Sequence, residues 1–331
     1  MIPEIQHAVI ITAAGGPEVL FERFDWPVPA QLGPDDVLIE IAAAGINRHD
    51  CNQRAAGPSR EPNPVPGLEA SGRIVACGSN VAKERLGEAV IALTDGGAYA
   101  QYVATDQHLA LPMPDGFDWV RGVALPEALF TTWFNFFDLM RMAPGETALI
   151  HGGSSGVGTI AIQLLHALGH DVFATAGTEE KRAVARGLGA RAVFDYADPD
   201  LAEQVRAATN GRGVDCILDT SAGAHIMQDL AALAAGGRIA FLSAGGGKEL
   251  SVPLRSLMAR RASVTGAFLR STPLELKRRI AGCLQQQVWP LLASAVRPYI
   301  DRVYPLSEAA RAHAHMESNG HIGKIVLSVR E

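Results

Sequence analysis

The fold of this chain is decided by Leu149-Ile150-His151-Gly152-Gly153-Ser154-Ser155-Gly156-Val157-Gly158, an apolar run that gives way to glycines. Apolar side chains return at residues 160, 161, 164, 165 and 168, which is the spacing of one helix face. Residues 171–176 form a second apolar run, so the pattern predicts a strand–helix–strand unit. Glycines at such a junction let the backbone approach a pyrophosphate, whose charge is stabilised by the N–H groups of the helix start. We interpret residues 153–158 as a dinucleotide site, with a glycine-rich structural turn as the alternative.

The composition is that of an ordinary globular protein about two domains long. The chain has 331 residues, of which 48% are apolar and 19% are charged. Its formal net charge of −6 argues against nucleic acid or an anionic membrane as the main partner. The sequence contains no apolar run of the roughly 18 residues that a membrane span needs. Residues 1–4 lack the basic-then-apolar form of a secretory signal.

The four cysteines favour a reducing compartment. Cys51, Cys77, Cys216 and Cys283 lie far apart, without a C-x-x-C pair. This spacing is typical of reduced thiols that are buried or incidental, and it offers no metal cluster. We therefore expect a cytoplasmic protein whose partner is a small molecule.

Two kinds of pattern divide the chain. Residues 1–125 contain short strands separated by Gly and Pro, at 7–12, 36–43, 72–77, 89–93 and 98–103. This spacing predicts a compact, mainly antiparallel, barrel-like domain. After a helical segment from residue 126, helices at 156–168, 179–188, 200–208 and 224–234 alternate with strands at 147–151, 171–176, 192–196, 214–219 and 237–242. Such alternation predicts a parallel sheet covered on both faces.

The C-terminal segment is expected to fold back onto the first domain. A strand at 263–269 ends the parallel sheet, and a helix at 273–288, a strand near 302–303, a helix at 307–316 and a strand at 324–329 follow. This tail is too short to form a domain of its own. We therefore predict an α/β protein in which a doubly wound domain, 126–269, is inserted into a discontinuous domain formed by 1–125 and 270–331.

The end of the second predicted strand indicates which dinucleotide binds. Sites for the non-phosphorylated coenzyme carry an acid about 20 residues beyond the glycines, which binds the ribose hydroxyls. Here the strand ends in Ala176-Gly177-Thr178, without a carboxylate. A 2′-phosphate would meet the hydroxyls of Thr178 and Tyr196 and the ammonium of Lys181. We therefore predict NADPH; the alternative for Lys181 is a solvated helix charge beside two glutamates.

Several motifs, in order along the whole chain, resemble one enzyme family. They are Ala43-Ala44-Gly45-Ile46-Asn47-Arg48-His49-Asp50, Pro66-Gly67-Leu68-Glu69-Ala70-Ser71-Gly72, the glycine turn, Ala176-Gly177-Thr178-Glu179-Glu180-Lys181, Gly213-Val214-Asp215, Leu269-Arg270-Ser271 and His321-Ile322-Gly323-Lys324-Ile325-Val326-Leu327. Together they resemble the quinone oxidoreductase (zeta-crystallin-like) branch of the medium-chain dehydrogenases/reductases. Within it the chain is most similar to the tumour-suppressor-inducible NADPH:quinone oxidoreductase type. The resemblance implies a Rossmann doubly wound parallel sheet inserted in a GroES-like, mainly antiparallel β-barrel domain.

The resemblance also implies a set of site residues. Asn47 and Thr131 would lie near the nicotinamide, where the Asn47 amide would orient the ring or the acceptor carbonyl. Asp50 and His49 are candidate proton carriers. The other implied coenzyme contacts are Ser221, Ala244, Phe268, Arg270 and Lys324. The alternatives are that Thr131 caps or packs a helix, that Phe268 belongs to the core, and that Asp50 only braces its turn.

The same resemblance predicts a zinc-free member. In the zinc alcohol dehydrogenases of this superfamily, a Cys ligand occupies the place of Asn47 and a His ligand the place of Leu68. An amide and an alkyl side chain do not hold a catalytic zinc, which binds thiolate, imidazole or carboxylate. The four-cysteine structural lobe of those enzymes is also absent from the sequence. His313 and His315, two residues apart on a predicted helix, face different ways and are expected at the surface.

The leading hypothesis is an NADPH-dependent enzyme that transfers a hydride to quinones. Without a Lewis acid the acceptor must take hydride readily, and the protein contributes mainly positioning. An enone or enoyl-thioester reductase is the alternative in the same class, and an NADPH-binding protein without turnover is the alternative of another class. Many relatives carry a tyrosine that lines the acceptor pocket. Residues 54–63 contain no aromatic side chain here, and Arg60 would instead present a cation.

The assembly prediction rests on residues 263–269, which resemble the edge strand through which family members pair their nucleotide domains. An unpaired apolar edge strand invites association unless it is covered. We therefore expect a homodimer formed through this strand.

Overall fold

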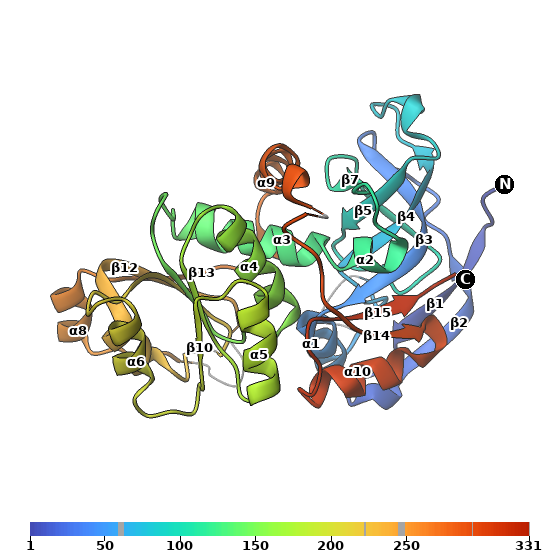
Figure 1. Cartoon of the computed structure of the whole chain (residues 1–331). Coiled ribbons are helices and arrows are strands. Elements are labelled where there is room, and N and C mark those ends of the chain that lie inside the picture. The colour runs from blue at the N-terminus through green and yellow to red at the C-terminus, as the bar shows by residue number, and fades with distance from the viewer. Residues whose placement is uncertain (59–62, 222, 244–248, 293, 331) are drawn as a thin grey trace. The chain divides into compact units, whose positions relative to one another are not determined.

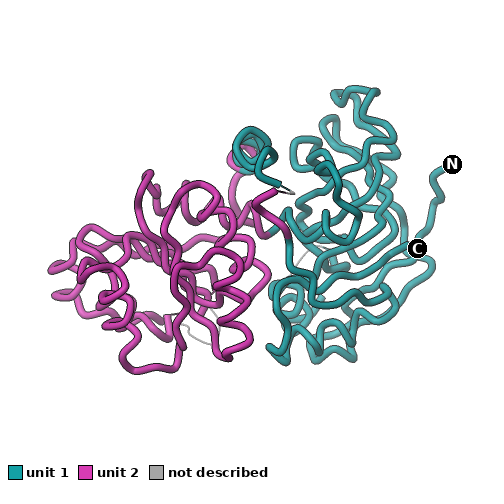
Figure 2. The backbone as a smooth tube through the Cα atoms, in the orientation of Figure 1, with its two compact units in different colours: residues 1–127, 277–293, 298–331 teal, residues 128–276, 294–297 magenta. Residues whose placement is uncertain are grey.

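The computed structural model describes residues 1–331 except 59–62, 222, 244–248, 293 and 331 (Figure 1). The chain forms two compact units (Figure 2). Unit 1 comprises residues 1–127, 277–293 and 298–331, and unit 2 comprises residues 128–276 and 294–297. Unit 2 interrupts unit 1 in the sequence, so the two terminal segments of the chain fold together. Among the described helices, none is long and apolar enough to span a membrane.

Unit 1 is built around a seven-stranded sheet. Its order is β14 (Ile300–Pro305), β15 (Lys324–Ser328), β3 (Asp36–Ile46), β4 (Glu69–Cys77), β5 (Ala89–Leu93) and β7 (Ala110–Pro112), with β6 (Tyr102–Asp106) paired to β3. All pairs are antiparallel except β14 with β15. The first half of β3 bonds β6 and its second half bonds β15. The C-terminal strand thus completes the sheet beside the end of β3. β1 (Ile5–Ile11) and β2 (Leu20–Pro27) form a separate two-stranded sheet.

Apolar side chains from both terminal segments share the core of unit 1. The helices of this part of the chain are α1 (Arg48–Ala56), α2 (Trp119–Val123), α9 (Leu274–Gln287) and α10 (Ala309–Glu317). α10 buries Ala309, Ala312 and Met316 in that core. His313 lies four residues after Ala309, on the same helix face, and is 0% exposed. The expectation that His313 lies at the surface is therefore wrong.

Unit 2 is a doubly wound parallel sheet. Its order is β10 (Ala192–Phe194), β9 (Val172–Thr175), β8 (Ala148–Ile150), β11 (Val214–Asp219), β12 (Leu233–Phe241) and β13 (Ser263–Gly266). The helices are α3 (Pro126–Trp133), which begins just before the unit, α4 (Gly156–Ala167), α5 (Glu179–Gly187), α6 (Leu201–Ala208), α7 (Ile226–Ala232) and α8 (Leu254–Arg260). On β8, Ile150 packs in a cluster with Ile162 of α4, and Leu149 in another with Val205 and Leu230 of α6 and α7. Both faces of the sheet are thus covered, and the predicted fold class is confirmed.

Some elements differ from the sequence prediction. The strand expected at 98–103 begins only at Tyr102, because Tyr99 bonds the carbonyl of Pro66 and Ala100 bridges to Ala8. The strand expected at 263–269 ends at Gly266, and Leu269–Ser271 forms a 3-10 turn. The patterns do not predict β2, β7, α1, α2 or α8. β7 is too short to show alternation, and α1 buries mainly polar side chains.

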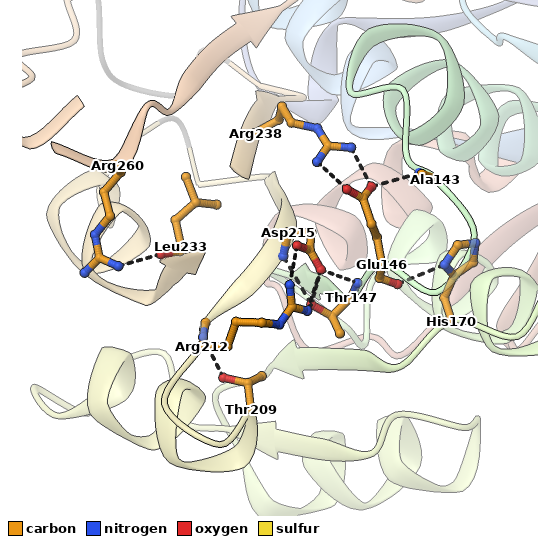
Figure 3. A network of polar contacts seen from close by, with 11 residues as sticks. Ala143, Glu146, Thr147, His170, Thr209, Arg212, Asp215, Leu233, Arg238 and Arg260 are labelled. Atoms are coloured by element: carbon orange, nitrogen blue, oxygen red, sulfur yellow. Dashed lines mark hydrogen bonds and ion pairs between the residues drawn. The ribbon is translucent and has the colours of Figure 1, made fainter. Parts of the chain in front are cut away.

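A polar network fastens the amino end of the parallel sheet (Figure 3). Thr147, just before β8, donates its N–H and its hydroxyl to Asp215 at 2.8 and 2.9 Å, and Arg212 contacts both carboxylate oxygens. Burial raises the pKa of Asp215, but the bonds from Arg212 and Thr147 outweigh it and hold the pKa below its usual range. Arg238 similarly contacts both oxygens of Glu146, at 2.8 and 2.6 Å. These charged groups pair with one another, as expected of a structural network. Ligands of such sheets bind at the opposite end, where the strands have their carboxyl ends.

Candidate functional site

The glycine turn lies at the carboxyl end of β8, before the start of α4. Gly152 has φ +72°, a left-handed conformation that residues with a Cβ rarely adopt. A Cβ on Gly158 would lie 2.3 Å from the Gly152 carbonyl oxygen, and one on Gly153 would lie 2.7 Å from the Cβ of Ala174. The turn therefore requires glycine at all three positions. At Gly153 and Gly158 neighbouring atoms of the protein itself take up the place of a side chain.

The start of α4 supplies hydrogen-bond donors at this turn. Ser155 is the N-cap, and its hydroxyl oxygen accepts the Gly158 N–H at 3.0 Å. The other N–H groups of a first helical turn have no acceptor within the helix, and they carry a partial positive charge. The predicted strand–turn–helix is thus present. Phosphate binding by residues 153–158 stays a prediction that this geometry allows.

The expected contacts of a 2′-phosphate gather beyond β9. A Cβ on Gly177 would lie 2.7 Å from the ring of Tyr196, so the tyrosine lies over this glycine. Tyr196 is nevertheless 48% exposed. The Thr178 hydroxyl caps α5 by accepting the Lys181 N–H at 3.2 Å, which places the start of the lysine side chain beside the threonine. The hydroxyls and the ammonium group that the sequence singled out therefore lie on adjoining segments.

Arg182 is a charged neighbour that the sequence reasoning missed. Its guanidinium donates to the Ala176 carbonyl at 3.2 Å and pairs with Asp195 at 2.9 Å. The Asp195 carboxylate is thereby neutralised close to the place where a 2′-phosphate would bind. The available signal was a second basic residue directly after Lys181 in the first turn of a helix.

In unit 1, Asn47 stands between the end of β3 and the start of α1, as the N-cap of that helix. Its side-chain amide is held at both ends. The oxygen accepts from the Lys324 ammonium at 2.6 Å, and the nitrogen donates to Glu69 Oε1 at 2.9 Å. Lys324 and Glu69 also pair directly with each other, and they are 2% and 0% exposed. The other Glu69 oxygen accepts the Glu127 N–H at 2.9 Å.

These contacts fix the orientation of the Asn47 amide. A flipped amide would place its N–H groups against an ammonium and its oxygen against a carboxylate, which are repulsive contacts. One of its two N–H donors faces Glu69, and the second has no protein partner among the described residues. Asn47 is 8% exposed, so that donor lies at the margin of the core. The sequence placed Lys324 among the coenzyme contacts; the structure places its ammonium in this buried pair.

Asp50 lies directly behind Asn47 and is 0% exposed. Its carboxylate accepts the N–H groups of Asn47 at 2.8 Å and Gly67 at 3.1 Å, and the Tyr99 hydroxyl at 3.3 Å. Burial raises the pKa of Asp50 to about 7, although the two backbone bonds act in the opposite direction. These contacts favour the alternative in which Asp50 braces its turn, and a proton-carrying role stays a prediction.

The chain of contacts continues from Tyr99 to α10. The Tyr99 hydroxyl lies 3.0 Å from His313 Nε2, and Arg54 lies 3.4 Å from the other ring nitrogen. Burial, and then the charge of Arg54, lower the pKa of His313 to about 3, so the imidazole is neutral. A neutral ring that accepts from Arg54 carries its proton on Nε2 and donates it to Tyr99. Sequence reasoning missed this chain, although residues 309, 312, 313 and 316 show the helical spacing of a buried face.

The remaining predicted residues lie in unit 2. Thr131 in α3 is 1% exposed, and its carbonyl accepts from the side chain of Asn135 at 2.8 Å. The Ser221 hydroxyl donates to Asp219 at 2.6 Å. Phe268 is 67% exposed, so the alternative that it belongs to the core is wrong. Arg270 lies in the 3-10 turn after β13, whereas Ala244 and Arg60 lie outside the described residues.

Metal ligands do not gather in the described part of the chain. Within it, no group of three or more His, Cys, Asp or Glu side chains is arranged to hold a metal ion. Leu68, at the place of a His ligand in the zinc alcohol dehydrogenases, is 7% exposed. Burial raises the pKa of the Cys51 and Cys216 thiols to about 12, so both stay protonated at neutral pH.

Comparisons with known proteins agree with this geometry. The alcohol dehydrogenase GroES-like domain matches residues 33–115, and the zinc-binding dehydrogenase family matches residues 156–285. The quinone oxidoreductase of Rattus norvegicus is 32% identical over 331 residues, which are 98% of this chain and 98% of that protein. The chain belongs to the quinone oxidoreductase family of the medium-chain dehydrogenases/reductases.

Two further relatives of this quinone oxidoreductase family member are of interest for its function. The quinone oxidoreductase of Thermus thermophilus, solved alone and with NADPH, has a TM-score of 0.82 at 29% identity, with 98% of this chain and 100% of that chain covered. A phthioceranic/hydroxyphthioceranic acid synthase of Mycobacterium tuberculosis is 33% identical over 307 residues, which are 90% of this chain and 14% of the synthase. The predicted family and fold are thus confirmed, and the chain is an oxidoreductase of that family. The tumour-suppressor-inducible subtype stays a prediction.

Proposed function

We propose that this protein is an NADPH-dependent reductase that transfers a hydride to quinones without a metal. The observation that carries the proposal is the set of contacts around Asn47. Where zinc-dependent members of the superfamily have a thiolate ligand, this chain has an amide locked between an ammonium and a carboxylate. Such an amide offers a directed N–H donor rather than a metal ligand.

The coenzyme site proposed for unit 2 fits the residues that are present. Gly153 and Gly158 have no room for a side chain, so the pyrophosphate would rest on the backbone of the turn and on the start of α4. Thr178, Lys181 and Tyr196 would hold the 2′-phosphate beside Gly177, against which the Tyr196 ring packs. Further contacts are proposed at Thr131, Ser221, Ala244, Phe268 and Arg270. When bound, NADPH supplies the hydride, and the residues of the chain hold the coenzyme in position.

In unit 1, Asn47 would act as an orienting donor. Its second N–H would bind the nicotinamide amide or the acceptor carbonyl, and its direction is set by Lys324 and Glu69. Asp50 holds the backbone N–H of Asn47 and thereby its place at the end of β3. Because Asp50 is fully buried behind Asn47, we propose that the reduced quinone takes its protons from solvent.

A second candidate is the reduction of an enone or an enoyl thioester. It is favoured by the 33% identity to a segment of the phthioceranic/hydroxyphthioceranic acid synthase, an enzyme named for the synthesis of an acid. Initial rates with NADPH on benzoquinone, naphthoquinone, a simple enone and an enoyl thioester separate the two. The leading proposal predicts that quinones have the highest kcat/KM and that simple ketones are inert. Quenching of NADPH fluorescence without turnover on any acceptor would instead favour a binding protein.

We also propose that the protein is a cytoplasmic homodimer. β13 is an edge strand of the parallel sheet and has partly exposed residues, and α8 beside β12 exposes Leu254 and Met258 by 69% each. Unpaired strand edges and exposed apolar side chains invite association. Sedimentation of a 35 kDa species alone at micromolar concentration would contradict the dimer.

A further inference from the structure

His151 is a buried histidine directly before the glycine turn. It is 2% exposed, at the carboxyl end of β8. Its Nε2 lies 2.7 Å from Asp229 Oδ1 on α7, and its Nδ1 lies 3.0 Å from the Thr175 hydroxyl at the end of β9. One side chain thus joins three elements around the turn. The next residue, Gly152, has the left-handed conformation that starts the turn.

Asp229 makes this cluster electrostatically unusual. It is 1% exposed, and its second carboxylate oxygen is buried without a hydrogen-bond partner among the described residues. An ionised carboxylate in this position is costly unless a positive charge stands next to it. Asp219, at the end of β11, is a second fully buried carboxylate close enough to act on His151. Two buried carboxylates thus lie behind the turn, and a proton on His151 would offset the charge of one of them.

The surroundings of His151 accommodate both of its charge states. When neutral, the ring donates from Nε2 to Asp229 and accepts the Thr175 hydroxyl at Nδ1. When protonated, it donates from Nδ1 to the same hydroxyl oxygen, so no heavy atom has to move. The half-buried His225 ring stacks on the His151 ring, with the two ring centroids 5.4 Å apart. Burial lowers the pKa of His151, but the hydrogen bond and charge of Asp229 and the charge of Asp219 outweigh it and raise the pKa.

We propose that His151 and Asp229 are a positioning pair for the coenzyme's phosphates, and that binding of the coenzyme is coupled to protonation of His151. This inference rests on the proposed NADPH function. A pyrophosphate on the turn places negative charge beside His151, which favours the protonated ring. By reciprocity, protonation of His151 strengthens coenzyme binding. The enzyme therefore takes up protons when it binds NADPH, and its affinity falls as the pH rises.

The test measures proton uptake by titration calorimetry of NADPH in buffers of different ionisation enthalpy, from pH 6 to 9. The 2′-phosphate of NADPH itself titrates near pH 6, so wild type is compared with His151→Gln at each pH. Glutamine keeps a donor toward Asp229 but cannot gain a charge. We expect wild type to take up as much as one proton more than the variant when NADPH binds. As the pH rises by one unit, the Kd of wild type should increase by up to about tenfold more than the Kd of the variant.

The matched control is His170→Gln, because His170 is equally buried but bonds the Glu146 carbonyl at the other end of the sheet. It should keep the wild-type uptake. Asp229→Asn, a second variant, should move the pH dependence to lower pH. If His151→Gln and wild type take up equal numbers of protons at every pH, the coupling is refuted, although NADPH still binds. If wild type binds no NADPH at any pH, both the coupling and the proposed function are refuted.

Discussion

The site around Asn47 in unit 1 and the glycine turn in unit 2 differ in how their polar groups are satisfied. Around Asn47 in unit 1, buried charges satisfy one another: Lys324 with Glu69, and Asp50 with two backbone N–H groups. At the glycine turn of unit 2, Gly153 and Gly158 exclude a side chain, and the backbone N–H groups of the helix start are donors that a ligand could bind. A site whose polar groups bond one another can fix the orientation of a side chain, whereas a helix start with N–H donors can bind a ligand. We therefore expect changes in unit 1 to act on stability and turnover, and changes in unit 2 to act on coenzyme affinity.

The largest expected effect is the loss of one partner of the buried ion pair. Lys324→Met leaves the Glu69 carboxylate buried without its cation, which typically destabilises a protein by about 3–5 kcal/mol. The double variant Lys324→Met/Glu69→Leu should recover much of that stability. Its kcat should still be low, because nothing orients the Asn47 amide. Urea unfolding and steady-state kinetics measure the two effects.

The matched control for this comparison is Lys277→Met. Lys277 is 3% exposed, but its partner Asp95 is 65% exposed and can be hydrated once the lysine is gone. The loss of stability should therefore be smaller than for Lys324→Met. Equal losses for the two lysines would show that the burial of Glu69 does not matter.

Gly158→Ala is the sharpest test of the turn. The new Cβ would lie 2.3 Å from the Gly152 carbonyl oxygen, so the turn has to shift. Overpacking of this kind destabilises by about 1–3 kcal/mol, and we expect NADPH affinity to fall at least about tenfold. Gly187→Ala is the control, because a Cβ there meets nothing within 4 Å. Fluorescence titration of both variants checks the prediction, and unchanged affinity in Gly158→Ala would contradict it.

Lys181→Ala should have a selective effect. Removal of a charge-assisted hydrogen bond to a 2′-phosphate loses roughly 1.5–3 kcal/mol, so NADPH binding should weaken about 10–100-fold. NADH lacks that phosphate, and its affinity should hardly change. Dissociation constants for both coenzymes measure the difference. Equal losses would assign Lys181 to the helix surface rather than to the phosphate.

The last prediction concerns the pH dependence of stability. The pKa of Asp50 is raised from 3.8 to about 7 in the folded protein, so its favourable contribution is complete below pH 3.8 and is lost as the pH rises through 7. Within that window the unfolding free energy falls by about 1.4 kcal/mol per pH unit. The difference in unfolding free energy between wild type and Asp50→Asn should therefore change between pH 4 and 7 and level off above. A constant difference would mean that Asp50 is ionised throughout.

Local patterns in the sequence were enough to predict the βα alternation and the glycine turn. The alternation follows from the periodicity of apolar side chains, and the turn follows from glycines, which close backbone contacts require. The motif around Asn47 could be recognised too, but its partners could not. Glu69 and Lys324 lie 22 and 277 residues away in the sequence, and only the sheet register brings them together. Asp229 lies 78 residues from His151 in the sequence, and the packing of α7 on the sheet brings the two together. His313 was a different error, since the helical spacing of α10 already indicated its burial.

The most direct test of the account is a single turnover of NADPH with a quinone before and after exhaustive chelation, with bound metal measured in the same sample. The account predicts tight NADPH binding, oxidation of NADPH at an unchanged rate after chelation, and no stoichiometric zinc. Loss of the reaction on chelation with recovery on adding zinc, or a lack of NADPH binding, would contradict it.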